Sequence, residues 1–415
     1  MGERGTASQA ESSSRENVAF DRGHGSDDRH LPLLGLRIVE LAGIGPGPFC
    51  GMMLADHGAQ VIRIDRPNEN LAGISIDPTR DVLLRSRRTI SIDLKSEAGV
   101  EVVRELAAGA DGFIEGFRPG VTERLGLGPD VLLGVNPKLV YGRMTGWGQD
   151  GPYASLPGHD INYIALSGAL AAVGRAGAAP TPPLNLVGDY GGGGLMLAFA
   201  MVSAILAARA GAPGRVIDCA MTDGSSLLMA GMWSLRANGA WSDERGTNLL
   251  DTGAPFYDTY RTPDDRYLAV GAIEAKLSAR LRHLAGFDDD EDFSHQHDRK
   301  RWPAMREKLA ARFAEHSLEH WCDLMEYDEC CFAPVVDMRD APAHPYNAAR
   351  EGFAEVDGVV QPLPAPRYSD VRFETPQMWR ENSDAAALLA ELGYDEAACE
   401  DLARRGAFGA TRRLA

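Results

Sequence analysis

The amino-acid sequence predicts an α/β protein with a Rossmann-like large domain, built on a parallel sheet, and a smaller α+β domain. Apolar strand-like runs alternate with helical segments up to residue 238, in units of strand, helix and strand of about 30 residues. After residue 242 the pattern changes to a turn-rich stretch followed by a strand and several helices. The 415 residues are also enough for two or three domains.

The periodicity predicts the elements in order. In the large domain we expect strands at 36–41, 59–65, 88–94, 111–115, 139–144 and 216–220, and helices at 49–57, 98–109, 192–210 and 224–238. The helix at 192–210 has apolar residues at the spacing of one face, namely Leu195, Phe199, Val202 and Leu206. In the smaller domain we expect a strand at 266–273 and helices at 277–286, 302–315 and 318–325, with an acidic loop at 288–292. A Pro-rich extended stretch at 336–370 and a helical segment at 385–405 follow.

These elements suggest the domain boundaries. Residues 1–30 are expected to be a disordered tail, because they contain few large apolar side chains to offset the entropy of ordering. The large domain is assigned to 31–235 and 350–415, and the small domain to 255–335. Residues 236–254 and 336–349 are assigned as linkers.

Composition restricts the classes of function. The net charge of −17 disfavours a general nucleic-acid binder but not a phosphorylated ligand, since a local arginine cluster can bind phosphate. The six cysteines have no metal-binding spacing, so we expect no metal site and free thiols in the cytoplasm. No apolar run of 18 residues and no signal-like stretch is evident, so no membrane span is expected.

Basic residues recur near the expected strand ends. For each one a solvated or capping side chain is the simpler explanation, but ligands of open α/β sheets bind at these ends, and the set predicts an anionic ligand. The set comprises Arg63, Arg66, Arg85, Arg87, Arg88, Lys95, Arg118 and Arg124. The turn Gly43-Ile44-Gly45-Pro46-Gly47 does not match the dinucleotide fingerprint, although it could approach a ligand.

Three ionisable residues are candidates for chemistry. His159 follows a glycine at a loop-to-helix junction and could act as a base, although an isolated histidine is more often structural. Asp189 precedes four glycines at the expected helix start, where free N–H groups could bind an oxyanion; the simpler alternative is a helix N-cap. Glu274 ends a strand and could orient a histidine from another domain or subunit, or could simply be solvated.

Methionines are concentrated in several of the predicted helices. Core packing is the expected role of most of them, and a groove for a variable acyl chain is the sharper hypothesis. They are Met52, Met53, Met196, Met201, Met221, Met229 and Met232.

Several segments together resemble the family III CoA-transferase superfamily over about 33–370. They are 36–67, 115–121 (Glu-Gly-Phe-Arg-Pro-Gly-Val), 143–149, 158–163 and 184–189. This superfamily includes true CoA-transferases, in which the aspartate matching Asp189 is a nucleophile, and alpha-methylacyl-CoA racemases, in which it exchanges a proton with the substrate. Transferases usually have another residue at the position of His159. The resemblance therefore implies a racemase with His159 on the opposite face and Glu274 as its partner, and a transferase is the alternative.

The resemblance also implies the assembly and the ligand contacts. We expect an interlocked homodimer whose active site lies between the large domain of one chain and the small domain of the other. The ligand is an acyl-CoA substrate of lipid metabolism, and no other cofactor is required. Expected contacts with the CoA are Arg66, Ile92, Leu94, Arg118, Arg124, Gly146, Asp160, Tyr163 and Asn185.

Overall fold

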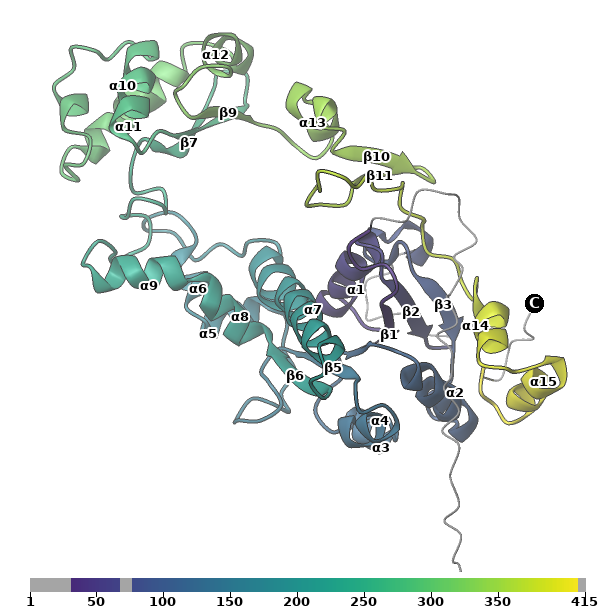
Figure 1. Cartoon of the computed structure of the whole chain (residues 1–415). Helices are drawn as coiled ribbons and strands as arrows, with labels where there is room; N and C mark the ends of the chain where they lie inside the picture. Colours follow the sequence, from purple (N-terminus) through teal and green to yellow (C-terminus); the bar gives the residue numbers. More distant parts are fainter. Residues whose placement is uncertain (1–30, 68–76, 410–415) are drawn as a thin grey trace, which may run out of the picture.

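The computed structural model describes residues 31–67 and 77–409, and within these ranges six parallel strands form one sheet (Figure 1). The strand order is β3-β2-β1-β4-β5-β6. The strands are β1 (Arg37–Leu41), β2 (Gln60–Asp65), β3 (Arg88–Ser91), β4 (Gly112–Glu115), β5 (Val140–Thr145) and β6 (Arg215–Ala220). The central strand β1 is buried along its whole length, as expected for a parallel sheet covered on both faces. The predicted α/β class is therefore confirmed.

Helices cover both faces of this sheet. On one face, α2 (Glu97–Ala108), α4 (Pro129–Val135), α14 (Ala385–Glu391) and α15 (Glu396–Arg404) contribute to one core cluster. On the other face, α1 (Pro46–Asp56) and α7 (Met196–Arg209) contribute to a second cluster. Shorter helices are η2 (Pro78–Arg80), η3 (Val82–Leu84), α3 (Val121–Arg124), α5 (Asp160–Leu166), α6 (Ala169–Ala172), α8 (Met221–Leu228) and α9 (Ala230–Ala237).

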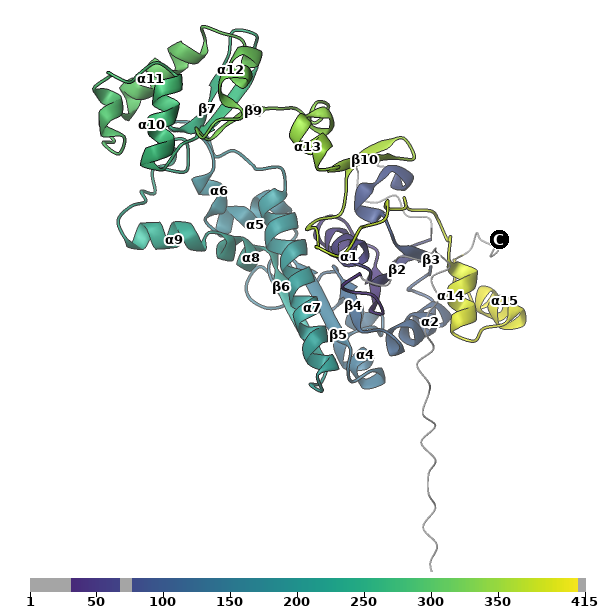
Figure 2. The ribbon, with the colours of Figure 1, turned by 45° about the horizontal axis from the view of Figure 1, so that its top comes forward.

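A second unit stands apart from the large sheet (Figures 1 and 2). In the described part of the chain, its antiparallel sheet has the order β7-β8-β9, with β7 (Tyr257–Arg261), β8 (Tyr267–Gly271) and β9 (Phe332–Val335). Its helices are α10 (Ala275–Leu284), η5 (Asp292–His295), α11 (Trp302–Phe313) and α12 (Leu318–Met325). Aromatic side chains such as Phe256, Phe313 and Trp321 fill a separate core. The predicted α+β character is thus present, although β7 lies in the stretch expected to be turns.

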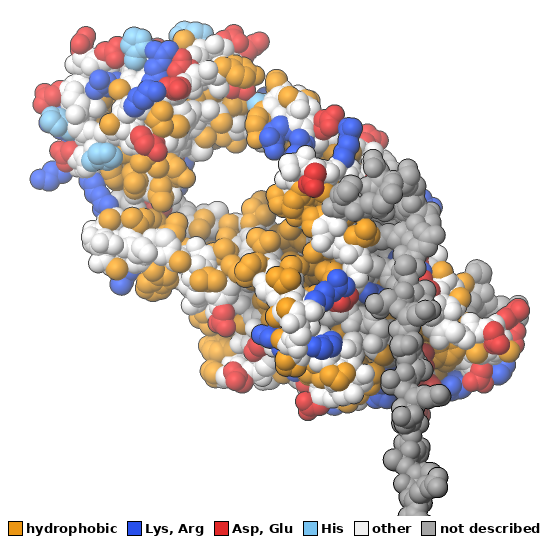
Figure 3. Space-filling model, viewed as in Figure 1, with side chains coloured by type: hydrophobic (Ala, Val, Ile, Leu, Met, Phe, Trp, Pro, Cys, Tyr) orange, Lys and Arg blue, Asp and Glu red, His pale blue; other side chains and the backbone are white. Residues whose placement is uncertain are grey.

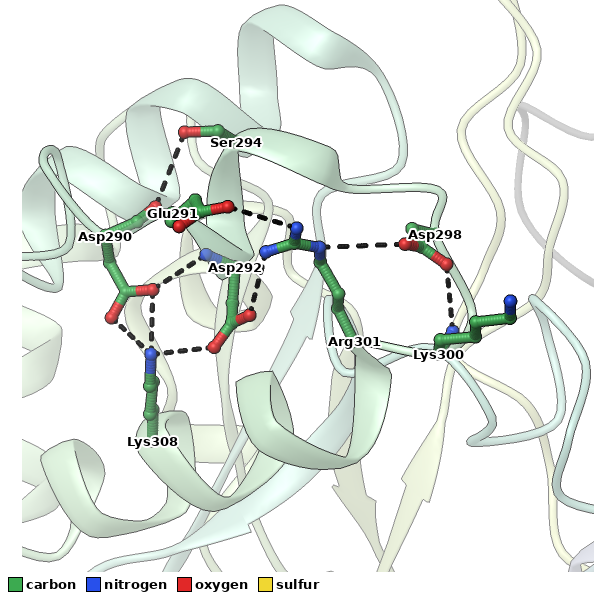
Figure 4. A network of polar contacts seen from close by, with 8 residues as sticks. All are labelled: Asp290, Glu291, Asp292, Ser294, Asp298, Lys300, Arg301 and Lys308. Carbon is green, nitrogen blue, oxygen red and sulfur yellow. Dashed lines mark hydrogen bonds and ion pairs between the residues drawn. The ribbon is translucent and has the colours of Figure 1, made fainter.

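The acidic loop of this unit is held by ion pairs (Figure 4). Lys308 of α11 contacts Asp290 at 2.5 Å and Asp292 at 2.8 Å, and Arg301 contacts Asp292 at 3.1 Å. Asp290 and Asp292 are thus paired within the unit.

The expectation of an extended stretch at 336–370 is wrong in part. The chain first forms η6 (Ala341–Ala343) and α13 (Pro345–Ala349), and then the antiparallel hairpin of β10 (Phe353–Val356) and β11 (Val359–Pro362). Asp357 and Gly358 connect the two strands, both with positive φ, as the tightest hairpin turns require. The chain returns through these elements to the large sheet, and the molecule encloses an opening (Figure 3).

The helix expected at 192–210 begins earlier and is apolar on all sides. A π-helical segment, η4 (Leu186–Leu195), leads directly into α7. Leu197, Met201 and Ile205 face the core, whereas Phe199 and Leu206 are 72% and 69% exposed. By length and composition Leu186–Arg209 could cross a membrane, contrary to the expectation that no such run exists, but half of its most apolar window is buried inside the protein.

Candidate functional site

Asp189 lies inside a helix and is not its N-cap. The N-cap of η4 is Asn185, in the left-handed conformation with φ 60°. The side-chain amide of Asn185 donates to Oδ2 of Asp189 at 2.9 Å. The backbone N–H of Asp189 donates to Oδ1 of the buried Asp160 at 2.7 Å. Asp189 is therefore held at its carboxyl group by Asn185 and at its backbone by Asp160.

The glycines after Asp189 serve helix packing. A Cβ at Gly192 would lie 2.6 Å from the backbone nitrogen of Ser225 in α8, and one at Gly194 would lie 2.7 Å from the carbonyl oxygen of Pro46 in α1. Gly192, Gly193 and Gly194 are buried within the helix. The expectation that the glycine run exposes N–H groups to a ligand is therefore wrong for these three residues, because neighbouring helices occupy that space.

The glycine turn after β1 reaches the same site. Gly45 has φ 64°, and a Cβ built on it would lie 2.8 Å from Oδ2 of Asp189. Only a residue without a side chain fits both this conformation and this close approach. The turn therefore makes room for the carboxyl group.

His159 is the N-cap of α5, and its side chain is exposed. Its backbone N–H donates to the side-chain oxygen of Asn162 at 3.0 Å, which fixes the entry to the helix. Burial raises the pKa of Asp189, the hydrogen bond from Asn185 lowers it, the negative charge of Asp160 raises it, and the charge of His159 lowers it. His159 is thus close enough to Asp189 to act on it electrostatically.

Tyr163 joins α5 to the loop after β5. Its hydroxyl donates to the carbonyl oxygen of Gly158, and its ring lies 4.8 Å from that of Trp147 in an edge-on arrangement. A Cβ at Gly146 would lie 2.0 Å from the Tyr163 ring. Burial, followed by the charge of Asp189, raises the pKa of Tyr163 to about 12, whereas the charge of Arg118 lowers it.

The residues expected to contact CoA include exposed arginines and buried core residues. Arg66, Arg118 and Arg124 are exposed, and the guanidinium of Arg66 lies 4.8 Å from the centre of the Phe117 ring. The side chains of Ile92 and Leu94 are only 0% and 8% exposed and pack in the core. A contact of these two residues with a ligand would have to come from their backbone.

Half of the basic set serves the fold. Arg63 and Arg87 both contact the fully buried Glu40, at 2.6 and 3.2 Å. Arg85 pairs with Asp56 at 2.5 Å, also in the interior. Arg88 pairs with carboxylates of the C-terminal segment, Asp384 at 3.2 Å and Glu391 at 2.6 Å. The expectation of an anionic ligand is therefore wrong for these four arginines, because three are buried with the carboxylates that a buried guanidinium needs and the partly buried Arg88 is paired with two.

Glu274 lies in the second unit, as the exposed N-cap of α10, and Ala272 and Ile273 separate it from β8. Among the described residues of this chain, no hydrogen bond or ion pair joins Glu274 to His159. The charge of His159 thus reaches the carboxyl group of Asp189, whereas Glu274 belongs to the second unit.

The methionines mostly pack in the core, as expected. Met201 and Met221 are buried there, Met53 and Met196 pack against it, and Met52 is 9% exposed. Met229 and Met232, next to and within α9, are partly exposed.

The cysteines and the acidic residues show no metal-binding arrangement in the part of the chain that the structure describes. The six cysteines, all within that part, are free thiols. Over 31–67 and 77–409, no group of three or more His, Cys, Asp or Glu side chains could hold a metal ion.

The sequence reasoning missed a buried polar network beneath the Arg118 loop. Glu115 is 1% exposed and accepts hydrogen bonds from Arg143 and from the N–H of Phe117. The sequence offers one signal for this network, a charged residue at the end of an apolar strand. A solvated glutamate at a strand end gives the same signal, so it does not reveal the burial of Glu115.

Comparison with known proteins places this chain in a family. Residues 33–382 match the family model of CoA-transferase family III. The chain belongs to CoA-transferase family III. Among family relatives, it is 41% identical to the alpha-methylacyl-CoA racemase of Mus musculus, over 88% of this chain and 94% of that protein. It is 42% identical to the racemase of the same description from Homo sapiens, over 81% of this chain and 86% of that protein.

A solved structure agrees with the family III fold. The crystal structure of a CaiB/BaiF family protein from Brucella suis has a TM-score of 0.75 and 27% sequence identity. The match covers 87% of this chain and 99% of that chain. Both the sequence and the fold therefore relate nearly the whole described chain to this family.

Proposed function

We propose that this family III protein is an alpha-methylacyl-CoA racemase, an isomerase that inverts the 2-methyl-bearing carbon of acyl-CoA thioesters. The observation that carries the proposal is that His159, at the start of α5, acts electrostatically on Asp189, whose pKa burial raises and whose backbone is bonded to Asp160 in that helix. Two relatives that are 41% and 42% identical over most of the chain are described as racemases of this kind. A base and an acid in one site are what inversion of a carbon acid requires.

The reaction is a two-base proton transfer through an enolate. One group removes the proton alpha to the thioester, and the other, already protonated, delivers a proton to the opposite face. An imidazole can act as a base near neutral pH, and burial keeps part of Asp189 protonated at higher pH than an exposed aspartate. The roles reverse for the other enantiomer. No cofactor beyond the CoA of the substrate is needed for these proton transfers.

The enolate oxygen requires hydrogen-bond donors. The first turn of α5 begins at Asp160, directly after His159, and the first N–H groups of a helix have no acceptor within the helix. These donors suit the enolate better than those of Gly192 and its neighbours, which lie within a helix. Loss of one such donor typically costs about 2.7–4 kcal/mol in the transition state.

The CoA contacts remain those implied by the family resemblance. Arg66, Arg118 and Arg124 are exposed cations suited to the phosphates. The positions expected to contact the rest of the CoA are Ile92, Leu94, Gly146, Asp160, Tyr163 and Asn185. Of these, Asp160 and Asn185 bond directly to Asp189, which favours a thioester lying beside that carboxyl.

An interlocked homodimer would complete the site. The opening between the large sheet and the second unit could accommodate another chain (Figure 3), and Phe199 and Leu206 present an exposed apolar face on α7. Glu274 of the partner subunit would then reach His159, as the resemblance implies. The boundaries at 31–235 and 350–415, 236–254, 255–335 and 336–349 would serve as domains and linkers of this assembly. The free thiols suit a cytoplasmic enzyme.

The second candidate is a CoA-transferase that uses Asp189 as nucleophile. The family contains such enzymes, and a 30% identical relative from Mycobacterium tuberculosis is described as a probable fatty acyl-CoA transferase. It would pass CoA to an added acid through an intermediate that hydroxylamine traps. The presence of His159 within electrostatic range of Asp189 favours the racemase.

The test replaces each proposed base. His159→Ala and Asp189→Ala should each abolish the interconversion of the two enantiomers of a 2-methylacyl-CoA, since inversion in either direction needs both groups. Chiral chromatography of the recovered thioester measures the interconversion. Interconversion at the wild-type rate in either variant would rule out the two-base mechanism.

A further inference from the structure

Glu115 is a buried carboxylate that the proposed proton transfer does not use. It ends β4 directly before the loop that contains Phe117 and Arg118. Its Oε2 accepts the backbone N–H of Phe117 at 2.7 Å, and its Oε1 accepts Nε of Arg143 at 2.9 Å. The side chain is therefore bonded both to the loop and to the neighbouring strand β5.

The same network fixes the far end of the loop. Arg143 also contacts the two carboxyl oxygens of Glu123, in α3, at 2.8 and 3.3 Å. Arg118 lies between the two anchored ends, Phe117 and α3. The loop is thus held to β5 on both sides of Arg118, although Arg118 itself is exposed.

Phe117 connects this network to a second cation. The guanidinium of Arg66, at the end of β2, lies 4.8 Å from the centre of the Phe117 ring. The charge of Arg118 also acts on Tyr163, whose own pKa is affected by Asp189. The loop therefore links two exposed arginines to the surroundings of Asp189.

We propose that ionised Glu115 is a positioning residue for CoA, which holds the loop so that Arg118 and Arg66 bind the phosphates together. The inference rests on the proposed function only in taking the ligand to be an acyl-CoA.

The titration of Glu115 gives the proposal a distinctive pH dependence. Burial raises its pKa to about 7, while the N–H of Phe117 and Arg143 lower it and the negative charge of Glu123 raises it. The neighbouring phenol of Tyr141 has its own pKa raised, by burial and by the charge of Glu115, so it is neutral in this range. If Glu115 were protonated, its O–H would face either the N–H of Phe117 or the guanidinium of Arg143. Two donors cannot bond to each other, so one of these two hydrogen bonds would be lost. CoA affinity should therefore fall as the pH drops below about 7.

The test compares Glu115→Gln with the wild type by calorimetric titration with CoA between about pH 6 and pH 8.5, on either side of this pKa. At the upper end of this pH range, the Kd for CoA and the KM for the acyl-CoA should be about tenfold higher in Glu115→Gln than in the wild type, while kcat changes little. A tenfold change corresponds to the loss of one charge-assisted hydrogen bond. The ratio of the two Kd values should approach one as the pH falls, because wild-type Glu115 then also becomes neutral. The ionisation of the CoA phosphates affects both Kd values equally, so its effect cancels in their ratio.

Asp56→Asn is the matched control. Asp56 forms a buried pair with Arg85, with both side chains 3% exposed, on α1 rather than in the loop. This variant should be less stable but keep the CoA affinity of the wild type and its pH dependence. Equal losses of affinity in both variants would show general destabilisation and overturn the proposal, as would an unchanged Kd in Glu115→Gln.

The outcome separates this proposal from the racemase assignment. If CoA binding depends on Glu115 but the wild type exchanges no deuterium, the positioning role stands and the racemase function fails. If the wild type exchanges deuterium and Glu115→Gln alters only kcat, the positioning role fails and the function stands. Absence of CoA binding by the wild type would overturn both.

Discussion

Asp189 illustrates how a single side chain depends on residues distant in the sequence. Its carboxyl is bonded by Asn185, its backbone by Asp160, and its Oδ2 lies against Gly45. The sequence predicts functional roles for Asp189 and His159, because each lies in a recognisable motif. It could not indicate the role of Gly45, since contacts across 144 residues of sequence leave no local signal.

Gly45→Ala should strongly reduce deuterium exchange. The added methyl group would lie 2.8 Å from Oδ2 of Asp189, at a φ of 64° that alanine rarely adopts. A displacement of about 1 Å at a reacting group can cost about a hundredfold in rate. Gly47→Ala is the control, because its Cβ would meet nothing within 4 Å. Exchange reduced equally in both variants would contradict this account of the turn.

The arginines mark the limit of sequence reasoning at the residue scale. Arg88 pairs with Asp384, 296 residues away, and Arg85 with Asp56, 29 residues away. A buried, ion-paired arginine and an exposed one look alike in the sequence. Only the exposed members of the set, Arg66, Lys95, Arg118 and Arg124, remain candidates for binding an anion.

At the scale of elements, the sequence predicts the strands that form a nearly continuous apolar run. It misses β7, which has no such run and contains a buried charged residue, and the hairpin strands, which lie in a proline-rich stretch. The strand β1 is an uninterrupted apolar run except for Arg37 and Glu40, and it was predicted within one residue of its observed start. The strand β7 was missed because Asp258 points inward, where it pairs with Arg175 and Arg306. The hairpin β10–β11 was missed although Asp357-Gly358 is a turn signal, since Pro-rich flanks suggested an extended chain.

Gly224→Ala should destabilise the contact between α8 and η4. A Cβ at Gly224 would lie 1.9 Å from the carbonyl oxygen of Gly192, so the two helices would have to move apart. Overpacking of this kind typically costs about 1–3 kcal/mol. Thermal denaturation should show a lower Tm than the wild type.

Gly231→Ala in α9 is the comparison for this prediction. Its Cβ would meet nothing within 4 Å, and alanine favours a helix over glycine by about 0.5–1 kcal/mol. Its Tm should therefore be unchanged or higher. A stable Gly224→Ala variant would show that the glycines are not needed for the packing.

At the scale of the whole molecule, α7 is the element that a single chain explains least. One side packs on the sheet, while Phe199 and Leu206 are 72% and 69% exposed on the other. A helix that is apolar all round is usually buried all round. A second chain covering the exposed side is consistent with the proposed dimer.

Phe199→Lys should therefore weaken the dimer. A charge placed in an apolar interface is costly, and the variant should sediment as a monomer in analytical ultracentrifugation. Because the proposed site takes Glu274 from the partner subunit, deuterium exchange should fall with dissociation. Val135→Lys, at the 47% exposed end of α4, should leave the assembly intact. A dimeric Phe199→Lys variant would place the interface elsewhere.

The most direct test uses the wild-type protein and one enantiomer of a 2-methylacyl-CoA in deuterated water, without an acceptor acid. The proposed two-base mechanism, with His159 and Asp189 as the bases, predicts that deuterium enters the alpha carbon and that both configurations appear in the recovered thioester. A thioester that keeps its configuration and gains no deuterium, together with transfer of CoA once an acid is added, would contradict the racemase and identify a transferase.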